Sequence, residues 1–119
     1  MKKAEFEEIL VMLKSATEKK KLNWSLAPND DTLFFTTING CRVDVSTYYD
    51  ASTMSNKAYI EFYNTNGDSF RKSTYSENIS KERYNQLSDL YDCINNQYYK
   101  IKESEQLIIE GLRDMIDDE

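Results

Sequence analysis

The side chains of this chain that could do chemistry are carboxylates, tyrosines, lysines and two cysteines. None of the 119 residues is a histidine, so Ser-His and Cys-His nucleophile systems and imidazole zinc sites are excluded within one chain. The sequence also lacks a phosphate-binding P-loop, a glycine-rich dinucleotide turn and a GxSxG elbow. We therefore predict a protein that is not an enzyme and that has no cofactor and no metal site.

Carboxylates are the commonest of these groups near the predicted sheet. Asp44 and Glu61 fall where both can share one sheet face. Such a pair does acid–base work only if its surroundings move the two pKa values apart. The sequence provides no such surroundings, and a solvated sheet face is the ordinary explanation for carboxylates in this position.

The two cysteines are interpreted as structural. Cys41 falls on the inward face of a predicted hairpin and Cys93 beside a helical apolar stripe, where thiols behave as small apolar side chains. The pair is too few for a zinc site and has no CxxC spacing. We expect reduced thiols rather than a disulfide between them.

Charge and hydropathy limit the possible partners. The net charge of −6 repels phosphate backbones, so we expect no nucleic acid. No apolar run approaches the roughly 18 residues of a membrane span, and glutamates interrupt the N-terminal segment where a signal peptide would be apolar. These features predict a cytoplasmic protein that does not bind membranes.

Apolar periodicity then predicts the elements. Spacing of i, i+3, i+4 and i+7 predicts a helix over about 3–19, and a short edge strand at 22–26 precedes the main sheet. The stretch "LFFTTINGCRVDV" (33–45) contains Asn39-Gly40, the pair typical of a type I′ hairpin turn. That turn puts Phe34 and Ile38 on the core face of the hairpin.

Two further strands and a helical region complete the pattern. "KAYIEFYN" (57–64) alternates as a strand, a turn at Asn66-Gly67 leads to a fourth strand near 69–74, and Ser80 is the predicted N-cap of the next helix. The helical apolar stripe repeats at 3-4 spacing and consists of Tyr84, Leu87, Tyr91, Ile94, Tyr98 and Ile101. It is expected to be a buried face.

The length of that helical region leaves two alternatives. A single helix over 81–116 would be about 54 Å long, more than a domain of this size can cover. We favour a break near Tyr99–Glu103 that leaves a third helix at about 104–116. The alternative is one long helix that protrudes and pairs with another copy.

The predicted fold is one α+β domain over residues 1–119. It has an N-terminal helix, an antiparallel meander of three to four strands, and one long or two shorter C-terminal helices on one sheet face. With "KLNW" (21–24), "YNTNGD" (63–68) and "LSDLYDCIN" (87–95) in this order, the chain resembles small bacterial single-domain proteins of α-β-α order. That resemblance implies a bacterial or phage-like source and no established activity.

Two function classes follow. The favoured one is a non-catalytic protein-binding module of inhibitor, immunity or anti-defence type, as a monomer or as a homodimer through the C-terminal helical region. The other is a small-ligand binder or minor enzyme with a pocket between helix and sheet. Alternation places the candidate partner-binding residues on the sheet face that helices leave open; they are Leu33, Phe35, Arg42, Tyr59, Glu61 and Tyr63. These side chains could instead simply pair with one another across the strands, or the C-terminal segment around Ile108 could fold over that face.

Overall fold

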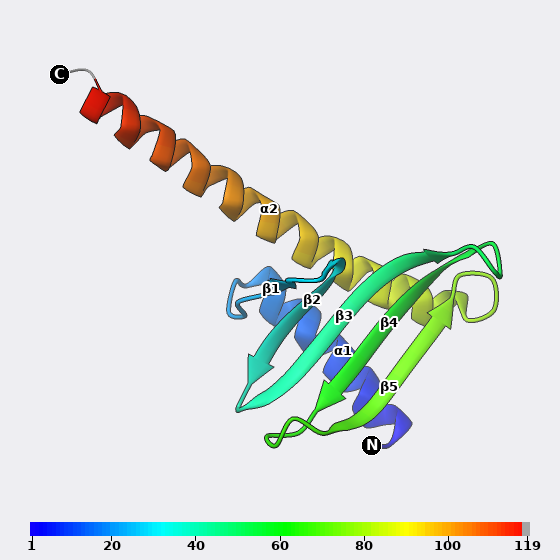
Figure 1. Ribbon diagram of the computed structural model, residues 1–119. Coiled ribbons are helices and arrows are strands. Elements are labelled where there is room, and N and C mark those ends of the chain that lie inside the picture. Colours follow the sequence, from blue (N-terminus) through cyan, green and yellow to red (C-terminus); the bar gives the residue numbers. More distant parts are fainter. Residues whose placement is uncertain (118–119) are drawn as a thin grey trace.

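The computed structural model describes residues 1–117 as two helices on one face of a five-stranded sheet (Figure 1). The elements in chain order are α1 (Lys3–Glu18), β1 (Ser25–Ala27), β2 (Asp30–Ile38), β3 (Cys41–Asp50), β4 (Ser55–Tyr63), β5 (Ser69–Ser76) and α2 (Lys81–Asp117). The strands lie in the order β1-β2-β3-β4-β5 and every pairing is antiparallel. The predicted α+β meander is confirmed.

The β2–β3 hairpin has the predicted register. Phe34 pairs with Val45, and Ile38 pairs with Cys41 across the turn. Asn39 and Gly40 both have positive φ, 51° and 81°, as a type I′ turn requires. The inner sheet face therefore carries buried apolar side chains from β2, β3 and β4.

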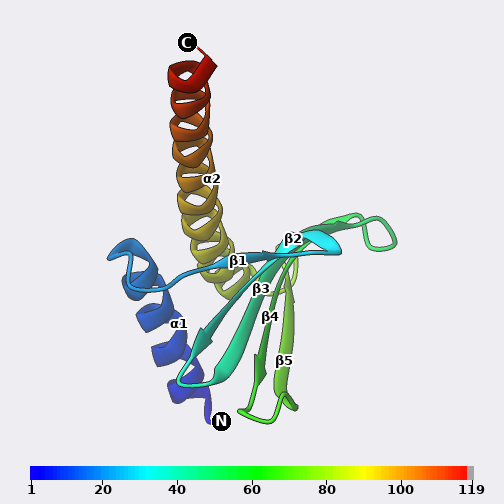
Figure 2. The same ribbon diagram turned by 60° about the vertical axis from the view of Figure 1, so that its left-hand side comes forward.

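Both helices cover this inner face (Figure 2). The rings of Tyr91 and Tyr98 in α2 pack on Phe34 with centroids 5.5 and 5.3 Å away, and Phe6 in α1 meets Phe62 edge-on at 6.1 Å. The remaining buried apolar residues are Leu10, Leu13, Val43, Val45, Ala58, Ile60, Leu87, Leu90 and Ile94. These contacts make one continuous core.

Thr17 joins the end of α1 to the rest of the molecule. Its hydroxyl donates to the Leu13 carbonyl at 2.7 Å and accepts from the Trp24 indole at 3.0 Å. Its own carbonyl accepts from the side-chain amide of Gln97 in α2 at 2.5 Å. Helix α1 ends one residue later, at Glu18, and Lys20 just beyond it has a left-handed φ of 58°, which stops the helix from continuing.

The predicted break in the C-terminal helix is wrong. α2 runs without interruption for 37 residues, about 55 Å at 1.5 Å per residue, and its second half extends beyond the sheet (Figure 1). The segment 99–103 contains no proline or glycine, and local bonds such as Lys102 to Glu105 at 3.4 Å continue through it. Compactness does not end a helix whose local sequence favours it.

One core assignment is also wrong. Ile38 has the predicted register but is 37% exposed, because it lies beside the hairpin turn at the end of β2. Phe34, on the same face, is 0% exposed.

These two residues give a matched test of the core. Phe34→Ala should lower the free energy of unfolding by about 3–5 kcal/mol, since it opens a cavity under α2. Ile38→Ala should cost about 1 kcal/mol or less. Urea denaturation of both variants measures the difference, and equal losses would contradict this description of the inner face.

Candidate functional site

The outer face of the sheet lies opposite both helices (Figure 2). The six predicted partner-binding residues all belong to this face, and none is fully exposed: Glu61 is buried and the other five are half-buried. The segment around Ile108 does not fold over them, because it belongs to the extended half of α2. Backbone alternation and strand register alone bring these side chains together.

Two carboxylates lie at the centre of the outer face. Asp44 on β3 and Glu61 on β4 are direct cross-strand partners, and their exposures are only 3% and 9%. Like charges placed opposite one another destabilise a sheet, and burying a carboxylate requires hydrogen-bond donors. The neighbouring residues provide them.

Hydroxyl groups surround Glu61. Its Oε1 accepts hydrogen bonds from the phenols of Tyr59 and of Tyr63, the latter at 2.9 Å, and its Oε2 accepts from Ser69 Oγ at 2.5 Å. Burial by itself raises the pKa of Glu61, but the bonds from Ser69, Tyr59 and Tyr63 outweigh it and hold the pKa below its ordinary value. Glu61 is therefore ionised at neutral pH.

The same contacts keep the two phenols protonated. Burial, followed by the bond to Glu61, raises the pKa of Tyr63 to about 12, and it raises the pKa of Tyr59 further. Both phenols therefore keep their protons near neutral pH, and neither acts as a general acid or a general base there. The cluster has the chemistry of a fixed surface rather than of an acid–base pair.

Arg42 neutralises the second carboxylate. Its Nε lies 2.6 Å from Asp44 Oδ1, and its guanidinium carbon is 4.1 Å from the centroid of the Phe35 ring and 5.8 Å from that of Tyr63. The aromatic rings thus hold the guanidinium in place while it satisfies the buried charge. Lys72, the β5 partner of Glu61, contributes a further cation 5.7 Å from the Tyr59 ring.

Leu33 lies on the same face at the side of this cluster. It lines a shallow groove of about 390 Å³ together with Tyr48, Tyr59 and Lys72. We name the whole set, Leu33, Phe35, Arg42, Asp44, Tyr59, Glu61 and Tyr63, the outer-face cluster. The position of Asp44 beside Glu61 was predictable from the sequence, whereas Ser69 and Lys72 follow only from the β4–β5 register.

A second concave feature lies between α1 and the sheet. It is an apolar groove of about 420 Å³ whose lining includes Ile9, Met12, Ile38, Cys41 and Phe70. Apart from the Cys41 thiol, its lining side chains are apolar. Specific small-molecule sites also contain a few polar groups that orient the ligand. This groove has room for a ligand but almost no polar group that could orient it.

Within residues 1–117, no group of three or more Cys, Asp or Glu side chains is placed to hold a metal ion. Neither of the helices described there is both long and apolar enough to cross a membrane. Cys41 and Cys93 are both free thiols.

Comparison with known proteins gives no match to a family model, to a curated protein or to a solved structure.

The Glu61 contacts predict a pH-dependent stability. A folded-state pKa below the unfolded value stabilises the fold above the unfolded pKa of about 4.3, and this contribution is lost as pH falls through the folded pKa. Glu61→Gln should therefore cost about 1–3 kcal/mol at pH 7, with the difference from wild type shrinking below pH 4. Urea denaturation from pH 3 to pH 7 measures it.

Glu103→Gln is the matched control, because Glu103 is exposed on α2. It should change stability by less than about 0.5 kcal/mol at every pH. A Glu61→Gln cost that stays constant with pH would contradict the ionised cluster.

Proposed function

We propose that this chain is a non-catalytic protein-binding module, of inhibitor, immunity or anti-defence type, that binds a protein partner on the outer face of its sheet. The observation that carries the proposal is the outer-face cluster: aromatic rings and Arg42, which are enriched at protein interfaces, already fixed around two buried carboxylates. Side chains held in place before binding lose little conformational entropy when a partner docks.

The electrostatics support a protein partner. The chain has a net charge of −6, which favours encounter with a basic surface and disfavours nucleic acid. A monomer, or a homodimer through α2, leaves this face open, because α2 lies on the opposite side of the sheet (Figure 2). Free thiols at Cys41 and Cys93 fit the cytoplasmic location that we include in the proposal.

The apolar groove between α1 and the sheet favours a second candidate, a small apolar ligand. Its volume of about 420 Å³ is within the usual range for ligand sites. We rank it lower because only the Cys41 thiol is available there to orient a ligand. An enzymatic role has less support still, since Glu61 stays ionised with both oxygens already accepting hydrogen bonds.

The proposal predicts that removing two anchors abolishes partner binding in a protein that stays folded, although the loss of the Tyr59 bond to Glu61 lowers its melting temperature. Phe35→Ser combined with Tyr59→Ser should reduce capture of the partner from a lysate of the native host by more than about tenfold, since aromatic anchors dominate interface energies. Pull-down with quantitative mass spectrometry measures capture, and thermal unfolding measures the fold.

Tyr49→Ser serves as the control, because Tyr49 is an exposed tyrosine on β3 whose alternation places it off the outer face. It should leave capture unchanged. The proposed site would be contradicted if wild type and the double variant captured the partner equally well, or if the double variant were unfolded at the temperature of the assay.

A further inference from the structure

Four cationic side chains line one pocket, where the first turns of both helices meet the edge strand β5. They are Lys3 from α1, Arg71 from β5, and Lys81 and Arg83 from α2. The pocket has a volume of about 660 Å³, and we name it the basic pocket. Two exposed carboxylates, Glu7 and Glu82, also line it. Positive charge is thus in excess here, in a chain whose net charge is −6.

Arg71 is a charged residue on the inner face of the sheet. It is the β5 partner of Phe62, which is buried on that face, and its guanidinium carbon lies 4.0 Å from the centroid of the Phe6 ring. Its Nε is buried and has no hydrogen-bond partner among residues 1–117, and the bond from its Nη1 to the Met1 carbonyl is long, at 3.5 Å. A buried donor without an acceptor costs free energy. Arg71 therefore has a donor for an acceptor from outside the chain.

Arg83 approaches the same aromatic ring from α2. Its guanidinium carbon lies 5.2 Å from the centroid of the Phe6 ring, and its Nη1 donates to Gln86 Oε1 at 2.6 Å. None of the ion pairs within residues 1–117 includes Arg71 or Arg83. Two guanidinium groups against one ring repel each other, and an anion bound by both would remove that repulsion.

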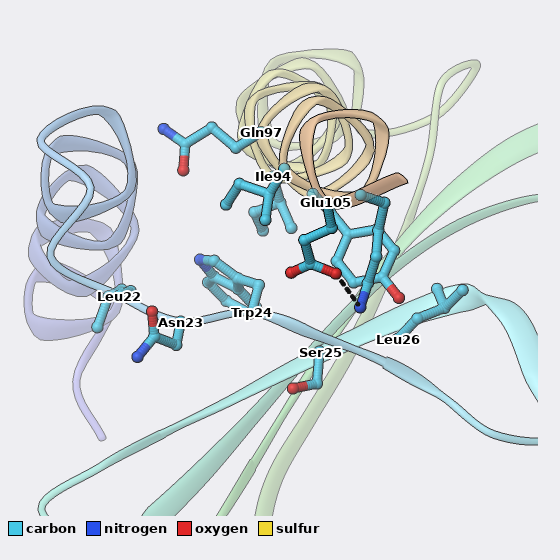
Figure 3. A pocket seen from close by; sticks show the side chains of 11 residues that line it. Leu22, Asn23, Trp24, Ser25, Leu26, Ile94, Gln97 and Glu105 are labelled. Carbon is cyan, nitrogen blue, oxygen red and sulfur yellow. Dashed lines mark hydrogen bonds and ion pairs between the residues drawn. The ribbon is translucent and has the colours of Figure 1, made fainter. Parts of the chain in front are cut away.

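The hollow between β1 and α2 shows the opposite arrangement (Figure 3). Of its described lining residues, Lys102 is the one cation and Glu105 the one carboxylate. These two side chains pair with each other at 3.4 Å. The charges of that hollow are therefore already compensated, unlike those of the basic pocket.

The ends of the two helices add to the positive potential of the basic pocket. Lys81 and Arg83 lie in the first turn of α2, and Lys3 is the first residue of α1. The N-terminal end of a helix has a partial positive charge, so cations there are unfavourable and anions are favourable. Lys2, which precedes α1, makes no capping hydrogen bond with its side chain. Backbone N–H groups of that first turn are thus free to donate to an anion.

Protection of the sheet edge explains only part of this arrangement. An inward-pointing charge on an edge strand prevents unwanted pairing with another strand, and Arg71 on β5 fits that role. The role does not extend to Lys81 and Arg83, which belong to a helix.

From these features we propose that the basic pocket binds the phosphate group of a small organic phosphomonoester. The fork of an arginine matches two oxygens of a phosphate, and helix N-termini bind phosphate through their backbone N–H groups. A phosphomonoester carries a charge of about −1.5 to −2 near pH 7. This charge compensates the excess of cations more fully than the single charge of a carboxylate ligand does.

The basic pocket also has room for the organic part of the ligand. Its volume is within the usual range for small-molecule sites. Tyr75, which is half-buried, and Ile79, which is 87% exposed, line it beside the cations and can contact an aromatic or apolar group. The inference goes beyond the proposed function, because none of the residues that line this pocket belongs to the outer-face cluster.

The first test titrates phenyl phosphate into the isotope-labelled full chain and follows the backbone amides by NMR. The amides that shift should be those at the starts of α1 and α2 and at Arg71. Inorganic phosphate, which lacks the ring, and benzoate, which lacks the phosphate, should each bind at least about fivefold more weakly.

Three results of this titration would overturn the proposal. They are no binding at about 10 mM phenyl phosphate, shifts that lie outside the basic pocket, and equal affinity for phenyl phosphate and either of the other two anions.

The second test removes the guanidinium groups one at a time. Arg83→Gln should raise the dissociation constant for phenyl phosphate at least about tenfold, since charge-assisted hydrogen bonds are lost. Arg113→Gln is the matched control, because Arg113 is exposed near the far end of α2 and its loss changes the net charge equally. It should change the dissociation constant less than about twofold. Equal effects of the two variants would indicate general attraction of anions and would overturn the site.

Arg71→Lys keeps the positive charge and removes the arginine fork. It should weaken phenyl phosphate binding at least about threefold. Circular dichroism and thermal unfolding show whether each variant is folded, and the Arg83 variant decides the question if the Arg71 variant is not. A folded Arg71→Lys protein that binds phenyl phosphate as tightly as wild type overturns the proposed site.

Discussion

Removing the inner face of the sheet from water is the constraint on which the rest of this molecule depends. Phe34 lies on that face with 0% exposure, and the rings of Tyr91 and Tyr98 cover it from α2. Fixing this contact fixes the position of α2 along the sheet. It also determines which residues of α2 remain beyond the sheet, because a straight helix cannot bend to follow the core.

The same constraint creates the polar cluster on the other face. Alternation along β3 and β4 that turns Val43, Val45 and Ile60 inward must turn Asp44 and Glu61 outward, opposite each other. Two facing carboxylates are tolerable because Arg42 and three hydroxyl groups surround them. The positions of the polar side chains on the outer face thus follow from the positions of the apolar side chains on the inner face.

Short-range signals in the sequence were sufficient for the sheet. Asn39-Gly40 fixes the turn, and the turn fixes the register of Phe34 with Val45. The continuity of α2 was not predictable from compactness, since helix propensity through 99–103 decides it locally. Burial of Asp44 and Glu61 was equally out of reach, because it depends on Ser69 from β5 together with the rings of Tyr59 and Tyr63 from β4 and of Phe35 from β2. The partner-binding role of the outer face stays a prediction.

The order of elements along the chain has a consequence for synthesis. Every strand pairs with its neighbour in sequence, so a nascent chain can assemble the sheet, with α1 beside it, before α2 has been made. Tyr98, which covers Phe34 in the finished fold, is added to the chain roughly sixty residues later. At ordinary elongation rates this delay is about 3–13 s. During that interval the apolar side chains that α2 later covers are exposed, and transiently exposed apolar surface of this kind is what makes unfinished chains prone to aggregate.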